Sequence, residues 1–454
     1  MSFLHPGRYS VGVLAVVVIL TGCGGSQSSS GTSGAMPQLS TRHQNGDAKG
    51  VPKVLYSFAG SPDGAQPRSG IEVYQGPNTN VGLVGTTLKG GDANNDGTMY
   101  GLTPIKKNVW TESVLYTFKG ANYSDGSEPV GIWKPLDATS PLFVTTLAGG
   151  TYGAGAVVEL TSSSGGSWTE NVLYSFGPSP DGQSPYAAVV GDKAGNLYGT
   201  TSAGGKFGAG TVYRMAPKGS SYIETVLYSF RGGTDGDQPY AGLIIDEKGG
   251  LYGTTVGGGS TGSGTVFKLT PNGSTYTESI LYSFQGPPYD GAEPYGGLTA
   301  VGTLPLAAGG KVVGMASSGG NQGYGTIYEL TLSGSHAKES VLWNFGSVPG
   351  DGAYPYGNVC TDKKGAVYGT TRAGGSGGSS GLGTFFTLTP SNSSTYKESV
   401  YSFTGANGAN PYAGPSVDSK GNLYVTTASG GSKDEGAVVT DLGPDNVQKK
   451  HVSC

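Results

Sequence analysis

Short runs of hydrophobic and polar residues follow one another along most of the chain, and the same arrangement returns at a regular interval. In the representative stretch Ala241–Phe284, four β-rich runs cover Gly242–Asp246, Leu251–Thr255, Gly264–Thr270 and Thr277–Phe284. Gly, Pro, Asn or Ser bounds each run, as is typical where strands meet tight turns. The pattern predicts four short antiparallel strands per unit and no amphipathic helix after the first 22 residues.

The unit occurs seven times. An aromatic residue in the fourth run marks the period, with spacings of 54 to 61 residues. These residues are Tyr56, Tyr116, Tyr174, Tyr228, Tyr282, Trp343 and Tyr401. Four antiparallel strands at a period close to the roughly 50 residues of kelch-type units favour sheets that close radially. We therefore expect an all-β, seven-bladed β-propeller over residues 51–454.

Two closures of the ring are compatible with the sequence. A strand-like run at Val54–Phe58 precedes the first unit, whereas the last unit ends with its third run at Gly436–Leu442. The first run is expected to complete the last sheet, because joining the two ends removes an open edge. The alternative gives this role to the C-terminal run Val447–Ser453.

The N-terminus has the features of a secretory signal. One cation, Arg8, precedes the apolar run Val11–Leu20, which is shorter than the roughly 20 residues that span a bilayer. The segment Leu20-Thr21-Gly22-Cys23 resembles a bacterial lipobox, which implies removal of residues 1–22 and lipidation of Cys23. Because Gly24 rather than Asp follows, the resemblance implies the outer membrane or the cell surface. The alternative is a signal peptide without lipidation.

Residues 23–50 are expected to form a flexible linker after the lipidated cysteine. They are rich in Gly, Ser, Thr, Asn and Gln, and so bury too little apolar surface to offset the entropy of ordering. Net charge is −4 without a basic run, which argues against a nucleic-acid partner. Cys360 and Cys454 also remain, and the sequence leaves their pairing open.

The recurrent motif "VLYSF…DG..PY.GL…G.LYGTT..GG…GTVF.L" resembles the GloVer tandem-repeat proteins, called choice-of-anchor because members carry different cell-surface anchors. The resemblance covers nearly the whole chain after residue 52 and implies surface display, without an established activity. The first two units depart from it with Arg68 and Val130 after the proline, and the last with Asn407-Gly408 in place of Asp-Gly.

Each unit carries a Pro-Tyr or equivalent pair after an Asp-Gly turn or, in the last unit, after Asn407-Gly408. In a propeller this connection and the one between the second and third strands share a face, so the tyrosines are expected to surround the mouth of the central channel. Such rings stack on sugars or on prolyl and aromatic groups. The alternative is that they pack between blades. The candidate ligand-binding tyrosines are Tyr186, Tyr240, Tyr295, Tyr356 and Tyr412.

Further candidates come from positions that differ between units. Arg68 replaces the tyrosine in the first unit, and Lys206, Phe207 and Arg372 lie in the variable connections after the second strand. A fixed frame with differing loops is typical of a recognition surface, although neutral drift gives the same pattern. We add these four residues to the candidate site.

One variable connection resembles the first half of a calcium loop. Asp92, Asn94 and Asp96 alternate as oxygen ligands would, but Thr103 stands where the bidentate Glu belongs. We therefore expect no cofactor, with structural calcium as the one candidate.

Residues that could carry catalysis are scarce. Glutamates at the start of each fourth strand are expected to point outward and to protect the sheet edge. These are Glu112, Glu170, Glu224, Glu278, Glu339 and Glu398. After loss of the signal, His43, His336 and His451 fall in separate parts of the predicted layout, so no zinc cluster or Ser-His pair forms.

The sequence favours a lipid-anchored, monomeric surface module that binds a glycan, a peptide or a protein partner without catalysis. One alternative is an assembly scaffold in the outer membrane. Another is a propeller lyase or hydrolase that uses the same face.

Overall fold

The computed structural model describes residues 52–454 apart from 76–80, 107–108, 136–140, 164–165, 220, 303–305, 307–308, 392–394, 441 and 443–451. Contacts divide the chain into Met1–Asp47 and Ala48–Cys454, and everything described lies in the second unit. The signal sequence, Cys23 and the linker lie outside the described residues. Within the described part, no helix is long and apolar enough to cross a membrane.

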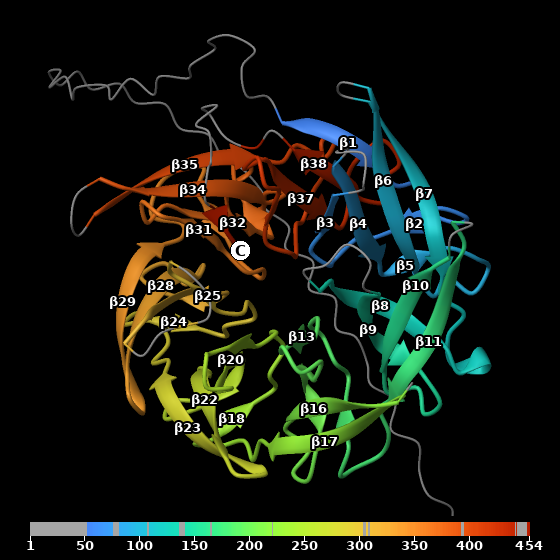
Figure 1. Ribbon diagram of the computed structural model, residues 1–454. Coiled ribbons are helices and arrows are strands. Elements are labelled where there is room, and N and C mark those ends of the chain that lie inside the picture. Colours follow the sequence, from blue (N-terminus) through green and yellow to red (C-terminus); the bar gives the residue numbers. More distant parts are fainter. Residues whose placement is uncertain are drawn as a thin grey trace, which may run out of the picture. The chain divides into compact units, whose positions relative to one another are not determined.

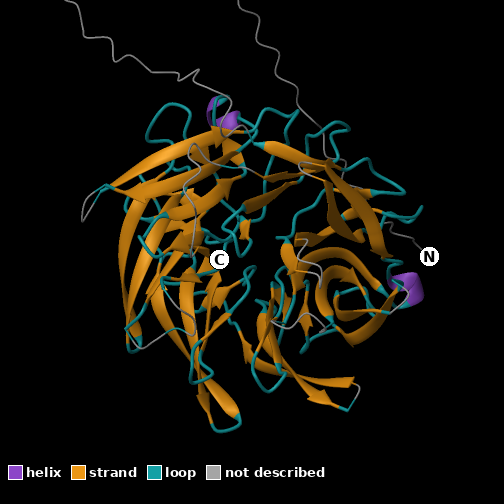
Figure 2. Ribbon diagram, turned by 45° about the horizontal axis from the view of Figure 1, so that its top comes forward, coloured by secondary structure: helices purple, strands orange, loops and turns teal. Residues whose placement is uncertain are grey.

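The second unit is the expected all-β, seven-bladed propeller, with four antiparallel strands in each blade (Figure 1). Figure 2 shows that strands dominate, and the helical turns among the described residues are the 3-10 segments Ala121–Tyr123 and Gly378–Ser380. The inner strands of blades 3 to 7 have two or three residues, whereas outer strands span up to nine residues.

The strands of blades 1 to 3, from inner to outer, have the following bounds. Blade 1 contains β3 (Glu72–Gln75), β4 (Val81–Thr87), β6 (Thr98–Lys106) and β7 (Val109–Thr117). Blade 2 contains β8 (Gly126–Trp133), β9 (Leu142–Gly149), β10 (Ala156–Ser162) and β11 (Trp168–Ser175). Blade 3 contains β13 (Val190–Gly191), β14 (Leu197–Thr201), β16 (Thr211–Lys218) and β17 (Ser221–Ser229).

Blades 4 to 6 repeat the arrangement. Blade 4 contains β19 (Ile244–Ile245), β20 (Leu251–Thr255), β22 (Thr265–Asn272) and β23 (Thr275–Ser283). Blade 5 contains β25 (Thr299–Ala300), β26 (Lys311–Ala316), β28 (Thr326–Ser333) and β29 (His336–Asn344). Blade 6 contains β31 (Cys360–Asp362), β32 (Val367–Thr371), β34 (Thr384–Pro390) and β35 (Tyr396–Ser402).

Blade 7 closes the ring by using both ends of the chain. Its strands β36 (Ser416–Val417), β37 (Leu423–Thr427) and β38 (Ala437–Thr440) are completed by β1 (Lys53–Ser57). The register places Lys53 opposite Thr440, and β1 lies beside β38 in Figure 1. The expected closure by the first run is confirmed.

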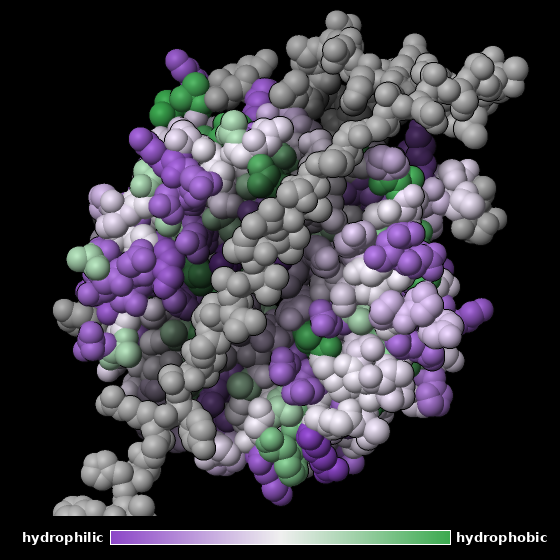
Figure 3. All heavy atoms as spheres, turned by 180° about the vertical axis from the view of Figure 1, so that it is seen from behind, coloured by the Kyte–Doolittle hydropathy of each residue, from purple (hydrophilic) through white to green (hydrophobic). Residues whose placement is uncertain are grey.

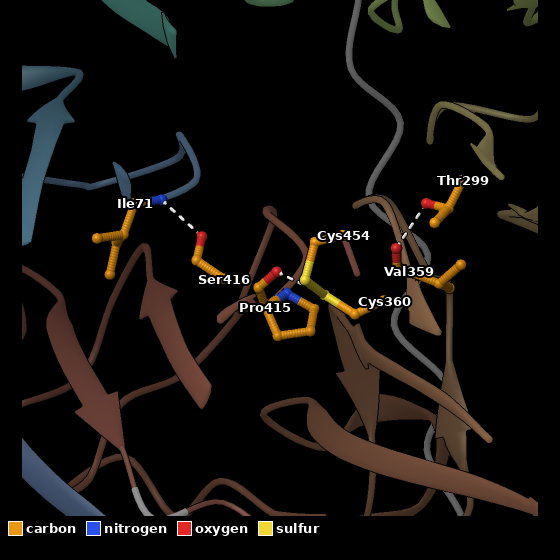
Figure 4. The surroundings of a disulfide bond; sticks show 7 residues. All are labelled: Ile71, Thr299, Val359, Cys360, Pro415, Ser416 and Cys454. Carbon is orange, nitrogen blue, oxygen red and sulfur yellow. Dashed lines mark hydrogen bonds between the residues drawn. A yellow bond between two sulfur atoms is a disulfide. The ribbon is translucent and has the colours of Figure 1, made fainter. Parts of the chain in front are cut away.

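The alternative closure is wrong, because the C-terminal strand β39 (Val452–Ser453) pairs with β31, the inner strand of blade 6. A disulfide joins Cys454 to Cys360 on that strand, so the pairing that the sequence left open is present. Figure 4 shows the disulfide beside Pro415 and Ser416 of blade 7. The C-terminus is therefore attached near the hub rather than at the rim.

The repeated "LYGTT" has a structural reason for each letter, as β14 (Leu197–Thr201) shows. The leucine is buried, and the tyrosine donates a hydrogen bond to Asp192 at 3.0 Å. A side chain on the glycine would overlap the ring of Tyr213 on β16. The first threonine donates to the carbonyl oxygen of Ala241 in the next blade at 2.8 Å, and the second pairs with Thr211 at 2.8 Å.

The hydrophobic core lies between adjacent blades. One cluster joins Phe58 and Val438 of blade 7 to Leu83 and Tyr100 of blade 1. Each blade buries a phenylalanine directly after its outer strand. These residues are Phe58, Phe118, Phe176, Phe230, Phe284, Phe345 and Phe403. Blade-to-blade burial explains why the fourth run is apolar on both faces.

Candidate functional site

The Asp-Gly turns fix the outer strand of one blade to the start of the next. In the turn before blade 4, Asp235 accepts hydrogen bonds from the Tyr228 hydroxyl at 3.0 Å, the Arg231 amide at 3.0 Å and the Gly236 amide at 2.8 Å. Corresponding contacts recur at Asp63 and Asp181. These carboxylates therefore have a structural role as turn residues.

The residue before each proline takes a left-handed backbone conformation. In blade 4 this is Gln238, with φ 58°, whose amide donates to the Ala209 carbonyl of blade 3 at 2.9 Å. Its own carbonyl accepts from the amide of Val256 at 3.1 Å. Left-handed non-glycine residues persist where the surroundings hold them firmly. This backbone clasp between blades fixes the proline and the tyrosine that follow.

Five tyrosines then form one continuous row, which we call the tyrosine arc: Tyr186, Tyr240, Tyr295, Tyr356 and Tyr412. Neighbouring ring centroids are 4.5, 5.2, 4.6 and 5.6 Å apart. Side chains of five successive blades can touch in sequence only where the blades converge, so the arc lies close to the propeller axis.

The tyrosines of the arc are partly accessible to solvent. Tyr186 is 38% exposed, and the other four tyrosines are partly exposed. Burial is the main cause that raises the pKa of Tyr295 to about 12, and it also raises the pKa of Tyr240 and Tyr356. The phenols are therefore neutral hydrogen-bonding groups beside an apolar ring surface.

Two arginines lie on the arc at its blade 7 end. The Cζ of Arg68 is 4.6 Å from the ring centroid of Tyr412. The Cζ of Arg372 is 5.7 Å from the same centroid and 5.1 Å from that of Tyr356. Arg372 also donates to the Tyr412 hydroxyl at 3.4 Å. Ring closure thus brings candidates from the first and sixth blades onto one tyrosine.

Lys206 and Phe207 belong to a different part of the connections. The Lys206 ammonium is 5.5 Å from the Phe207 ring centroid, and the guanidinium of Arg231 is also 5.5 Å from it. No ring contact joins Phe207 to the tyrosine arc in the part of the chain that the structure describes. The structure therefore brings together seven of the nine candidate ligand residues and leaves this exposed pair in a separate cation–aromatic cluster.

Two acidic residues near the arc were missed by the sequence analysis. Glu293 is exposed, and its charge contributes to raising the pKa of both Tyr295 and Tyr356. Asp237 acts in the same direction on Tyr240. Both lie within three residues of an arc tyrosine on the chain, and that proximity was the available signal.

The oxygen atoms of the candidate calcium loop are used within the loop and its neighbours. Asp92 accepts from the Asn94 amide at 2.8 Å, and Asp96 accepts from the Ser127 hydroxyl at 2.5 Å. Among the residues that the structure describes, no three His, Cys, Asp or Glu side chains gather as metal ligands would.

The glutamates of the outer strands do not simply point outward. In each of the six, at least one carboxylate oxygen is buried and has no hydrogen-bond partner. Burial, followed by the nearby charge of Asp181, raises the pKa of Glu224 to about 7. Strand β17 still faces blade 2, so a side chain directed toward that blade is covered. The expectation of edge-protecting charges was wrong in this respect.

The visible surface is mixed in character. On the face shown in Figure 3, hydrophilic and hydrophobic residues are interspersed among many residues of intermediate hydropathy. This agrees with a chain that has 13% charged residues and 84 glycines.

Fold and site together define a seven-bladed propeller in which tyrosines of five successive blades are in contact. A family model described as the Gloeobacter/Verrucomicrobia repeat matches residues 77–305 and 301–443. The chain therefore belongs to this repeat family, as the sequence motif indicated. A search of curated proteins found no match.

Solved structures of other proteins align with this chain at low sequence identity. A putative 6-phosphogluconolactonase from Bacteroides uniformis aligns over 81% of this chain and 93% of its own, with 10% identity and a TM-score of 0.51. A glucose dehydrogenase aligns over 70% and 96%, with 14% identity and a TM-score of 0.41. The NanB sialidase from Streptococcus pneumoniae aligns over 86% and 69%, with 12% identity and a TM-score of 0.40. At 10% identity, the alignment with a TM-score of 0.51 concerns the fold alone.

Proposed function

We propose that the protein is a non-enzymatic binding module that holds its ligand on the tyrosine arc. The observation that carries this proposal is the contact of five tyrosines from successive blades, with ring centroids 4.5 to 5.6 Å apart. Partly exposed aromatic rings offer large contact area at low entropic cost, and their phenols supply hydrogen bonds. Glycans, peptides and protein loops are the ligand classes that such a surface fits.

The positioning of the arc supports binding rather than a purely structural role. Its backbone is already fixed by the clasp at Gln238 and by the Thr200 hydrogen bond to Ala241. The rings therefore need little further ordering when a ligand arrives, which lowers the entropic cost of association. Asp181 and Glu224, whose charges influence each other, lie on an Asp-Gly turn and on the outer strand β17 rather than among the residues of the arc.

The test is a glycan and peptide array probed with the purified full-length protein in a detergent that lacks a sugar headgroup. Each Tyr→Ala change in the arc is expected to cost about 0.5 to 1.5 kcal/mol, or roughly two- to tenfold in affinity. The triple variant Y186A/Y240A/Y295A should therefore lose binding. Tyr289→Ala is the matched control, because Tyr289 is 80% exposed and lies outside the arc. Unchanged binding by the triple variant would contradict the proposal.

We further propose that lipid on Cys23 holds the module at the outer membrane or the cell surface, as a monomer. The lipobox-like segment before Cys23 supports this. Cys23→Ser should move the protein from the membrane fraction to the soluble fraction. If the wild-type protein already fractionates as soluble, the anchor proposal fails while the binding proposal stands.

A further inference from the structure

The phenols of the tyrosine arc differ in their hydrogen bonding from the tyrosines that are fixed by an aspartate. Nine tyrosines elsewhere donate to an aspartate of their own turn or hairpin. In the described structure, the hydroxyls of Tyr186, Tyr240, Tyr295 and Tyr356 form no hydrogen bond to another residue. A phenol both donates and accepts, so four free phenols in a row suit a ligand that carries many hydroxyl groups.

Positive charge is concentrated at one end of the arc. Arg68 and Arg372 both approach the ring of Tyr412, at 4.6 and 5.7 Å from its centroid. Within the described residues the ion pairs involve lysines, at Lys89, Lys268 and Lys311, and neither arginine takes part in one. Both guanidiniums therefore lie within 6 Å of the Tyr412 ring centroid, and neither has a carboxylate partner among the described residues. Guanidiniums bind carboxylates through charge-assisted N–H donors, so this end of the arc suits a carboxylate.

Two acidic residues neighbour arc tyrosines in the chain. The exposed Glu293 lies two residues before Tyr295 and Asp237 lies three residues before Tyr240, and the charge of each contributes to raising the pKa of the tyrosine that follows it. A ligand with acidic groups along its whole length would bring some of them close to these carboxylates. The charge pattern therefore fits a ligand with one acidic end and a neutral remainder.

We propose that the ligand is an oligosaccharide that ends in a single carboxylate-bearing sugar. The acidic sugar lies at Tyr412 with its carboxylate between Arg68 and Arg372, and the neutral sugars follow the arc toward Tyr186. This assignment rests on the proposed binding function and deepens it. A sugar ring stacks its C–H face on an aromatic ring while its hydroxyls reach the phenols. A peptide supplies a terminal carboxylate too, but stacks only where a planar side chain recurs.

The experiment compares ligands that differ in one feature. Four immobilised probes are used: a neutral oligosaccharide, the same oligosaccharide capped with one terminal uronate, a homopolymeric polyuronate, and an aromatic-rich peptide with a free C-terminal carboxylate. The full-length protein is tested in sugar-free detergent, as wild type, R68M, R372M and R68M/R372M. Lys206→Met is the matched control, since it removes one exposed cation from a connection of the same kind. Circular dichroism checks that each variant is folded.

The capped oligosaccharide should bind about tenfold more tightly than the neutral one, because charge-assisted hydrogen bonds are roughly twice as strong as neutral ones. Each arginine variant should lose part of this preference and the double variant all of it, while affinity for the neutral probe stays within about twofold. Lys206→Met should keep the full preference. The polyuronate should bind more weakly than the capped probe.

Three outcomes overturn the inference. If the capped and neutral probes bind equally well, the ligand needs no acidic terminal sugar. If the peptide binds more tightly than the capped oligosaccharide, the ligand is a peptide rather than a glycan. Equal loss of preference in Lys206→Met shows that only overall charge matters. In each case, sensitivity to the arc triple variant would leave the proposed function intact, whereas insensitivity would remove both.

Discussion

The outer-strand glutamates predict a stability that depends on pH. Glu224 is representative: one carboxylate oxygen is buried without a partner, and burial and then Asp181 raise its pKa from 4.5 to about 7. Tyr174 and Tyr213 are the other titratable groups whose pKa values its charge influences. The perturbation is Glu224→Gln, which keeps the shape and makes the side chain permanently neutral.

The sign follows from the raised pKa in the folded state. The folded protein binds this proton more tightly than the unfolded chain, so protonation contributes stability that is fully present below pH 4.5 and lost as the pH rises through about 7. A shift of this size corresponds to about 3.4 kcal/mol for a fully buried group. Because Glu224 is partly exposed, solvent screening lowers the expected contribution to about 1 kcal/mol.

The assay is urea unfolding at pH 5 and pH 8, compared between wild type and variant. The free energy of unfolding of Glu224→Gln should exceed that of wild type by about 1 kcal/mol at pH 8, and the two should agree near pH 5. Glu247→Gln is the control, since Glu247 is exposed on a hairpin turn.

Because the six glutamates lie in different blades, the gains in the free energy of unfolding from the six Glu→Gln changes should be additive. Together they should amount to roughly 6 kcal/mol at pH 8. The effect at Glu398 should be the largest, since burial and Asp351 raise its pKa to about 9. If Glu224→Gln weakened the protein equally at both pH values, the buried oxygen would have a partner and the reasoning would be refuted.

Three further predictions concern single contacts. Tyr213→Phe should leave the free energy of unfolding unchanged or raise it by about 1 kcal/mol, because the buried hydroxyl has no hydrogen-bond partner. Phe267 and Phe386 occupy the same position in other blades. A loss above about 1 kcal/mol in urea unfolding would contradict this prediction. Thr200→Val should lower the free energy of unfolding by about 1 kcal/mol and weaken ligand binding at Tyr240, because the Thr200 hydrogen bond to Ala241 joins blades 3 and 4. Unchanged stability in urea unfolding would show that this hydrogen bond contributes nothing. Cys454→Ser should lower stability by about 2 to 4 kcal/mol and, in hydrogen exchange, expose β31 without exposing β1, because β39 pairs with blade 6 and the disulfide joins the same blade. Simultaneous loss of protection in β1 would show that the tail also supports the ring.

Much of the architecture follows from the sequence because each letter of the repeat has a local cause. The period gives the blade number, and the missing outer strand of the last unit identifies β1 as its partner. Strand bounds were less accurate. Gly242–Asp246 was expected as a strand, but β19 is only Ile244–Ile245, and Gly242 before it lies against Ala187 and Ala188 of the preceding blade.

Other features depend on contacts that no local pattern contains. Arg68 and Arg372 meet at Tyr412 only because the ring closes. The disulfide depends on where the last residues pair, and alternation along β17 does not reveal that a glutamate faces the preceding blade. Sequence therefore identifies the tyrosine arc, whereas its charged surroundings require the structure.

Because β1 must wait for β38, the protein cannot finish folding until nearly all of it has been synthesised. Roughly 380 residues separate the two strands, so at about 5 to 20 residues per second the earliest strand remains without its partner for roughly 20 to 80 seconds. During that time its main-chain amides are open to pairing with other chains. A protein truncated at either end should therefore aggregate rather than form a propeller with fewer blades. Solubility thus depends on the presence of both β1 and β38 in the same chain.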